Sequence, residues 1–216
     1  TQGYRQPGST IKPFIYSAAM EKNRMNPNSV VDDKPIKIGS WQPKNADGRY
    51  LGPIPLSTAL ASSRNMVSIR LLQSIGNDYF RSYAERFGFE GKRIDKYLTV
   101  ALGAIEATPY QIVGAYGVFA HGGYTVDPYF IKQVVDRSGT VISEAKPRLA
   151  KDETNRVITK EKAAMTDAWL NGVVRGGTAR AASAVGRSGI AGNTGTINDS
   201  VDAWFAAYQP KLVAVA

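Results

Sequence analysis

Apolar residues recur at helical spacing along much of the chain. After Ser9, the apolar residues Ile11, Phe14 and Ile15 are spaced as on one face of a helix, which predicts a helix beginning at or next to Ser9. Pro13 is compatible with this helix because it falls near the first turn, where a missing N–H does little harm. Further helices are predicted at 57–75, 78–87, 99–120 and 160–174.

Toward the C-terminal end the pattern changes from helical to extended. Strands are predicted at 189–196, 202–208 and 212–216, and a hairpin at 129–136 and 140–143. Residues 26–56 are rich in Pro, Gly, Asn and Asp and predict a long irregular segment, which in a compact domain is more often functional than idle. Because helices come first and strands last, without β-α-β alternation, the chain is predicted to be α+β with an antiparallel sheet.

Composition narrows the chemistry. The 216 residues favour a single domain spanning 1–216. The absence of Cys and the presence of one His exclude a disulfide scaffold, a thiol nucleophile and a metal site of several imidazoles. His121 is predicted to be structural, so we expect any catalytic base to be a lysine or a carboxylate. Nothing suggests a metal or a nucleotide cofactor, because P-loop and dinucleotide fingerprints are missing.

The net charge of +9 is spread along the chain. Because no block of like charges and no nucleic-acid-binding motif accompanies it, we expect no nucleic-acid partner. No apolar run approaches the roughly 20 residues of a membrane span. The sequence begins with Thr1 and ends on an apolar run, so we expect it to be part of a longer protein.

The first candidate for catalysis is Ser9-Thr10-Ile11-Lys12. Residues three apart on a helix are neighbours, so the Lys12 amine could reach the Ser9 hydroxyl and activate it once burial or nearby positive charge lowers the pKa of the lysine. The alternative is an ordinary helix cap with a solvated lysine. A second Ser-x-x-Lys, from Ser143 to Lys146, leaves a predicted strand, so helical pairing is not expected there.

Two further polar groups interrupt apolar stretches. Ser63 and Asn65 lie inside a predicted helix and can turn a hydroxyl and an amide into one cleft, although they also fit the polar face of an amphipathic helix. Asn193-Thr194-Gly195-Thr196 lies on a predicted strand, where threonine hydroxyls can bind a carboxylate and the glycine lets a substrate backbone lie close. The alternative there is a plain strand.

Read together, Ser-x-x-Lys, Ser-x-Asn and a Thr-Gly strand match, in this order, the signature of penicillin-recognising serine enzymes. The sequence resembles the transpeptidase domain of bifunctional class A penicillin-binding proteins of the 1a type. That resemblance implies a penicillin-binding/serine β-lactamase-like fold, with an antiparallel sheet flanked by helices plus an all-helical subdomain. It is carried by Gln6-Pro7-Gly8-Ser9 through Phe14, 63–72, Ala101-Leu102-Gly103, Thr108-Pro109, 119–123 and Asp202-Ala203-Trp204-Phe205.

The resemblance also implies a role for each catalytic candidate. Ser9 would attack the penultimate D-alanine carbonyl of a peptidoglycan stem peptide and expel the terminal D-alanine. Lys12 would be the general base, Ser63 would relay the proton to the leaving amine, and Asn65 would hold Lys12 and the substrate amide. An amine of a neighbouring stem peptide would then attack the acyl-enzyme, whereas β-lactams would remain bound to Ser9.

The strand motif is implied to bind substrate through Asn193, Thr194, Gly195 and Thr196. Thr194 and Thr196 would bind the substrate carboxylate, and the backbone N–H groups of Ser9 and Thr196 would form the oxyanion hole. The family has Lys where this chain has Asn193. Since a hydrogen bond to a charged group contributes about 1.5–3 kcal/mol, or roughly 10- to 150-fold, we expect a slowed enzyme.

A second departure from the family is truncation. From the resemblance we expect this sequence to be without the strands that precede the nucleophile, the last helix, the glycosyltransferase domain and the membrane anchor. The domain is therefore expected to be incomplete at both termini and to leave a sheet edge exposed. The parent protein is expected at the periplasmic side of a bacterial inner membrane. Its expected partners are stem peptides, lipid-linked or on nascent glycan, and β-lactams. The alternatives are an impaired peptide- or partner-binding module, or a D,D-carboxypeptidase or β-lactamase of the same superfamily.

Overall fold

Helix α1 (Lys12–Asn23) lies at the centre of the molecule in the computed structural model, which describes residues 2–197 and 202–216. Every residue from Lys12 to Met20 is buried, as expected for a helix that is apolar on most sides. Phe14 packs against Phe87 and Phe119 in an aromatic cluster, with ring centroids 5.1–5.2 Å apart. The first turns of α1, which follow Ser9, are therefore held by the core.

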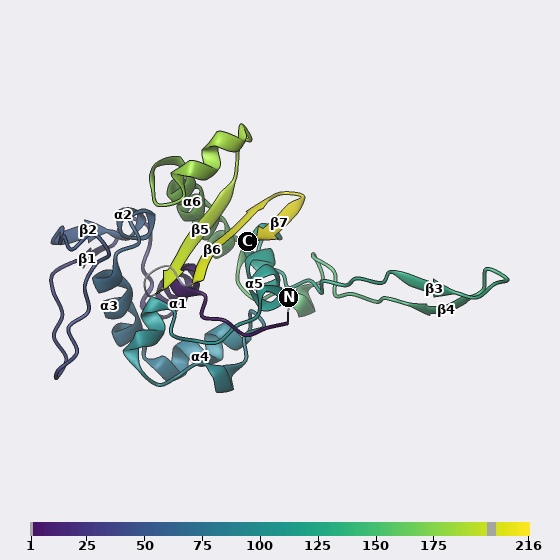
Figure 1. The fold of residues 1–216 in the computed structure, drawn as a ribbon, viewed down its shortest axis with the longest axis horizontal. Coiled ribbons are helices and arrows are strands. Elements are labelled where there is room, and N and C mark those ends of the chain that lie inside the picture. Colours follow the sequence, from purple (N-terminus) through teal and green to yellow (C-terminus); the bar gives the residue numbers. More distant parts are fainter. Residues whose placement is uncertain (1, 198–201) are drawn as a thin grey trace.

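Helices surround α1 (Figure 1). Their bounds are α2 (Leu56–Ala61), α3 (Asn65–Ile75), α4 (Asn77–Glu85), α5 (Pro109–Ala120) and α6 (Lys160–Gly176). Short 3-10 helices are η1 (Gly8–Ile11), η2 (Gly91–Arg93), η3 (Leu98–Leu102), η4 (Glu153–Asn155) and η5 (Arg180–Val185). None of the helices in the described part of the chain combines the length and apolarity needed to cross a bilayer.

The main sheet is antiparallel, with the order β5 (Ala191–Ile197), β6 (Asp202–Gln209) and β7 (Leu212–Val215). Its register pairs Thr194 with Phe205 and Gly195 with Trp204. Strand β5 packs on η1 and α6, and β6 and β7 pack on α5. The three strands predicted near the C-terminal end are confirmed, and helices with antiparallel sheets confirm the α+β class.

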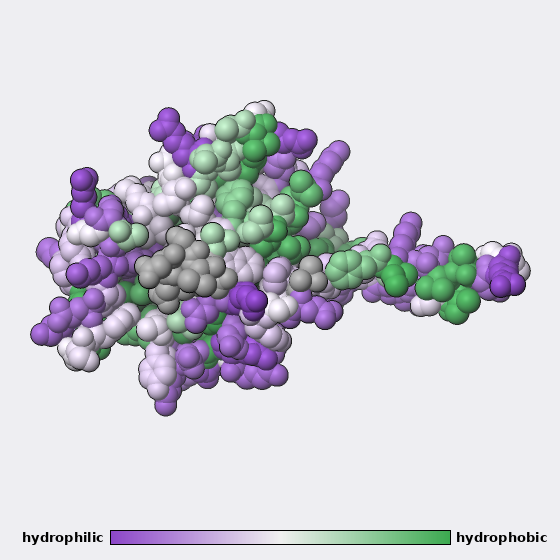
Figure 2. Space-filling model, viewed as in Figure 1, coloured by the Kyte–Doolittle hydropathy of each residue, from purple (hydrophilic) through white to green (hydrophobic). Residues whose placement is uncertain are grey.

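Two smaller hairpins complete the strands. The long segment at 26–56 is irregular, as predicted, except where β1 (Val30–Asp32) pairs with β2 (Pro53–Pro55). The predicted hairpin is present as β3 (Gln133–Val135) and β4 (Val141–Glu144), and it projects far from the body of the molecule (Figure 1). Apolar side chains are exposed along this arm, including Ile131 and Ile142 (Figure 2).

Two predicted helices are each interrupted, so their predicted extents were wrong. The helix predicted at 57–75 divides into α2 and α3 at residues 62–64, where Ser63 has a φ of 50°. The helix predicted at 99–120 divides into η3 and α5 at Gly103, whose φ is 89°. A β-carbon at Gly103 would overlap the backbone of Gly8, so this turn brings η3 directly against the residue before Ser9.

Candidate active site

Ser9 lies in η1, one turn before the amino end of α1. Gly8 takes a φ of 54°, and the hydroxyl and backbone N–H of Thr10 both donate to the Pro7 carbonyl, at 2.7 and 3.2 Å. The Tyr116 hydroxyl donates to the Thr10 carbonyl at 2.9 Å. The predicted helix start is confirmed, and Ser9 stays half-buried on a turn whose neighbours are buried.

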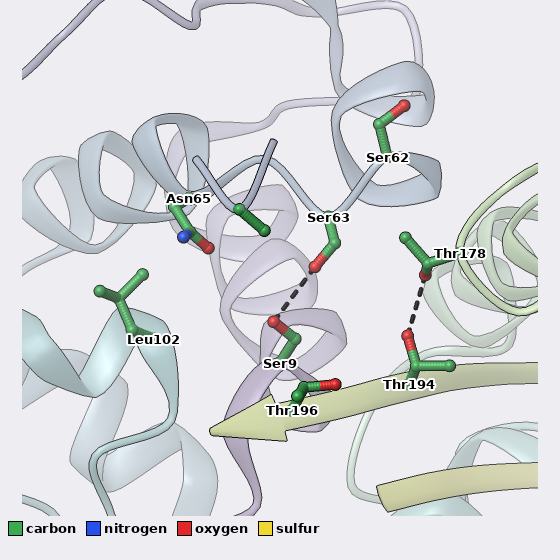
Figure 3. A pocket seen from close by; sticks show the side chains of 9 residues that line it. Ser9, Ser62, Ser63, Asn65, Leu102, Thr178, Thr194 and Thr196 are labelled. Carbon is green, nitrogen blue, oxygen red and sulfur yellow. Dashed lines mark hydrogen bonds between the residues drawn. The ribbon is translucent and has the colours of Figure 1, made fainter. Parts of the chain in front are cut away.

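Lys12 is fully buried, and its amine contacts the 62–64 turn and α3. Nζ donates to the Ser63 carbonyl at 2.7 Å, to Ser63 Oγ at 2.9 Å and to Asn65 Oδ1 at 2.7 Å. Ser63 Oγ in turn donates to Ser9 Oγ at 3.1 Å (Figure 3). Among the described residues Lys12 has no direct hydrogen bond to Ser9, so the Ser63 hydroxyl connects the amine to the candidate nucleophile.

The environment of Lys12 favours the neutral amine. The pKa of Lys12 is lowered to about 7, first by burial and then by the nearby Arg64 guanidinium, while the Asp33 carboxylate acts in the opposite direction. A lysine with this pKa can accept a proton near neutral pH, which an ordinary surface lysine cannot. Lys12 is therefore the candidate for the lysine base that the composition led us to expect.

Strand β5 divides its four candidate residues between two faces, because side chains alternate along a strand. Thr194 and Thr196 line the cavity beside Ser9 (Figure 3). Asn193 is fully buried on the other face, where its Nδ2 donates to the Ser9 carbonyl at 2.7 Å and its Oδ1 has no partner among the described residues. A β-carbon at Gly195 would overlap the Pro7 carbonyl, so this glycine brings β5 against η1.

The cavity itself has a volume of about 470 Å³. Most of its polar lining was predicted from the sequence, but Ser62 and Thr178 were not. Thr178 accepts a hydrogen bond from the Thr194 hydroxyl at 3.0 Å (Figure 3). Thr178 follows the Gly-Gly pair that ends α6, a position with no motif around it. The lining drawn from the described residues is uncharged: Ser9, Ala46, Ser62, Ser63, Asn65, Leu102, Thr178, Thr194 and Thr196.

The second Ser-x-x-Lys is not part of this site. Ser143 lies in β4, and both Ser143 and Lys146 are exposed on the projecting arm. The prediction that this copy forms no helical pair is confirmed. The same residue pattern therefore builds a cluster at Ser9, where a helix begins in the core, and none on an exposed strand.

Known proteins are similar to this chain over nearly its whole length. The family model for the penicillin binding protein transpeptidase domain matches residues 1–215. The chain is 47% identical to penicillin-binding protein 1A of Neisseria lactamica over 99% of its own length and 27% of that protein, and 37% identical to penicillin-binding protein 1A of Pseudomonas aeruginosa. It thus spans about a quarter to a third of these relatives, at 27% and 32% of their lengths.

Solved structures give the same result. The crystal structure of penicillin-binding protein 1A from Haemophilus influenzae matches all of this chain and 38% of that one, with a TM-score of 0.91 and 36% identity. An imipenem acyl-enzyme complex of penicillin-binding protein A from M. tuberculosis matches 98% of this chain and 54% of that one with a TM-score of 0.83, but at 21% identity it shows the fold alone. The fold expected from the sequence is confirmed.

Proposed function

Because this chain belongs to the penicillin-binding protein transpeptidase domain family, we propose that it is the catalytic domain of a serine D,D-transpeptidase that cross-links peptidoglycan stem peptides. The observation that carries the proposal is the hydrogen-bonded series Lys12–Ser63–Ser9 at the wall of the cavity. A buried lysine with a pKa of about 7, joined to a half-buried serine through one hydroxyl, is suited to acyl transfer.

Acylation begins with Lys12 neutral. Ser9 Oγ attacks the carbonyl carbon of the penultimate D-alanine, while the Ser9 proton passes to Ser63 Oγ and the Ser63 proton passes to Lys12 Nζ. The tetrahedral intermediate then collapses to an ester on Ser9. The terminal D-alanine leaves as an amine that receives its proton back from Lys12 through Ser63. Asn65 Oδ1, at 2.7 Å, keeps the Lys12 amine in line with Ser63 throughout.

Deacylation uses the same groups. The amine of a second stem peptide attacks the ester carbonyl, its proton passes through Ser63 to Lys12, and the cross-linked peptide leaves as Ser9 recovers its own proton. Thr194 and Thr196 line the cavity, and their hydroxyls would donate hydrogen bonds to the substrate carboxylate. The backbone N–H groups of Ser9 and Thr196 are the proposed oxyanion donors.

Asn193 distinguishes this chain from the lysine-containing pattern of the family. Its buried amide acts on the nucleophile through the Ser9 carbonyl and adds no charge to the cavity. The proposed enzyme therefore binds the substrate carboxylate with neutral donors and acylates more slowly than a lysine-containing relative. The same feature favours the second candidate, a module that binds peptide without turnover.

For the longer protein that contains this domain, we propose a substrate, a location and a class of inhibitors. Its substrates are lipid-linked or nascent stem peptides at the periplasmic face of a bacterial inner membrane. Its inhibitors are β-lactams, which acylate Ser9 in place of the stem peptide. A structural neighbour, penicillin-binding protein A from M. tuberculosis, is described as an acyl-enzyme complex with imipenem.

A labelled penicillin tests the proposal on the full-length protein. We expect a covalent adduct that is lost in Ser9→Ala and kept in Ser143→Ala, a matched control in the other Ser-x-x-Lys. Absence of an adduct on the wild-type protein, or an adduct that survives Ser9→Ala, would overturn the serine mechanism and leave the binding module. With stem peptide and an amine acceptor, hydrolysis without any cross-link would rule out transpeptidation and leave a hydrolase of the same superfamily, a carboxypeptidase or β-lactamase.

A further inference from the structure

Asp33 is a fully buried carboxylate that the mechanism above does not use. It follows β1, inside the irregular segment at 26–56. Oδ1 accepts a hydrogen bond from Asn45 Nδ2 at 2.9 Å, Oδ2 accepts one from the Leu51 N–H at 3.1 Å, and Arg64 Nε lies 3.6 Å from Oδ2. Burying a charge costs free energy unless it is paired and hydrogen-bonded, so the segment is organised around this carboxylate.

Asn45 transmits the position of Asp33 to α3. Its Oδ1 accepts from the backbone N–H of Asn65 at 2.8 Å and of Met66 at 3.4 Å, which are among the N–H groups that a helix leaves free at its start. Its Nδ2 also donates to the Arg49 carbonyl at 2.8 Å. An ionised carboxylate only accepts hydrogen bonds, so Asp33 orients the amide with its nitrogen inward and its oxygen toward α3.

Arg64 makes a second link, inside the 62–64 turn. Its side chain is 9% exposed and lies between Asp33 and Asp47. It donates two hydrogen bonds to the Asp47 carboxylate, of 2.8 and 3.0 Å. Ser63, its neighbour, has a φ of 50°, a strained value for a residue with a side chain. Such a conformation persists only where the surroundings fix it, and here Arg64 and Asn65, the two residues that follow Ser63, are both bonded to the 26–56 segment.

We propose that Asp33 is a positioning residue of the acyl transfer, which through Asn45 and Arg64 holds Ser63 and Asn65 in contact with Lys12. This inference rests on the proposed function, since positioning has meaning only if Lys12 and Ser63 move protons. It gives the long irregular segment a role, namely to carry a buried carboxylate and its amide partner to the carboxyl side of α2 and the start of α3.

The negative charge of Asp33 also affects the pKa of Lys12, which its hydrogen bonds to Asn45 and Leu51 do not. The charged groups acting on Lys12 are Arg64, which lowers the pKa of the lysine, and Asp33, which raises it. Strand β5, which packs on η1, adds no charge there, because it presents the neutral Asn193 to the Ser9 carbonyl and the neutral Thr194 to the cavity. Removing the negative charge therefore lowers the pKa of Lys12, and the acid limb of the acylation rate moves to lower pH.

The test measures acylation by a labelled penicillin against pH, with the thermal midpoint, on the full-length protein. Asp33→Asn is expected to lower the maximal rate about tenfold or more and to move the midpoint of the acid limb to lower pH. Asp32→Asn, the same change one residue earlier on a partly exposed side chain that pairs with Lys34, is the matched control and is expected to do neither. Asn45→Ala keeps the Asp33 charge, so it should lower the rate and leave the midpoint in place.

Each outcome decides the matter. An Asp33→Asn profile that coincides with that of Asp32→Asn overturns the inference, as does a lower rate with an unmoved midpoint. If Asp33→Asn does not fold, Asn45→Ala decides: a rate equal to wild type overturns the positioning role. Failure of the wild-type protein to form a Ser9-dependent adduct is a different result and overturns the proposed function instead.

Discussion

Replacing Asn193 with lysine is predicted to accelerate acylation. Asn193 lies beneath the nucleophile, and its amide donates to the Ser9 carbonyl at 2.7 Å. The cavity lining among the described residues is uncharged, so the substrate carboxylate meets only neutral donors there. Position 193 is on the face of β5 opposite to Thr194 and Thr196, but a lysine side chain is longer than asparagine, so its ammonium group is expected to extend past the Ser9 carbonyl to the edge of the cavity where the carboxylate of a β-lactam is proposed to bind.

Two hydrogen bonds set the size of the effect. The bond from Asn193 to the Ser9 carbonyl is neutral and contributes about 1 kcal/mol, which the substitution loses. A charge-assisted bond to the substrate carboxylate contributes about 1.5–3 kcal/mol. The net gain is about 0.5–2 kcal/mol, or roughly 2- to 30-fold in the acylation rate. The new cation also lowers the pKa of Lys12, so the gain is larger below neutral pH.

The assay compares second-order rate constants of acylation by a labelled penicillin for the full-length wild-type protein, Asn193→Lys and Asn193→Met. Methionine has an unbranched, uncharged side chain one atom shorter than that of lysine, and it loses the same bond to Ser9. Asn193→Met is expected to be no faster than wild type. If the lysine and methionine variants react at equal rates, and their thermal midpoints show that both are folded, the claim that a cation at position 193 accelerates acylation is refuted.

Three other results are expected. Acylation of the wild-type protein should rise about tenfold per pH unit below about 7 and level off above it, because only neutral Lys12 accepts a proton; a flat rate profile would contradict this. Between pH 7 and 10.5 Lys12 is protonated in the unfolded chain and neutral in the folded one, so the free energy of unfolding should increase with pH. Denaturant titration measures this increase, and Lys12→Met should remove it. Gly195→Ala should slow acylation about 100-fold or more by pushing β5 from Pro7, whereas Gly114→Ala, in open space on α5, should leave the rate unchanged.

Local patterns predicted the parts of the site that depend on local geometry. Ser9 and Lys12 are three residues apart where a helix begins, so their proximity follows from helical spacing alone. The period of two in the C-terminal strands likewise predicts that Thr194 and Thr196 share a face. Which face meets the cavity depends on the packing of β5 against η1, and no periodicity encodes that.

The remaining features depend on contacts between distant segments. The break at Ser63 depends on contacts with Asp33 and Asn45, which are distant in the sequence. The local apolar spacing contains no sign of these contacts and therefore predicts one continuous helix. The Asp33 segment has no repeating pattern, and its role follows only from where the chain folds back. The direct reach from Lys12 to Ser9 that the spacing allowed is replaced by a path through Ser63, since the amine turns toward the 62–64 turn.

The contact between Gly103 and Gly8 restricts how this protein can vary. A side chain at Gly103 would overlap the main chain of Gly8, and no substitution at position 8 removes main-chain atoms. Compensating pairs of substitutions, which allow most packed positions to drift together, are therefore unavailable here. Sequence change in this protein therefore has to occur at other positions, while this crossing of two backbone segments is kept.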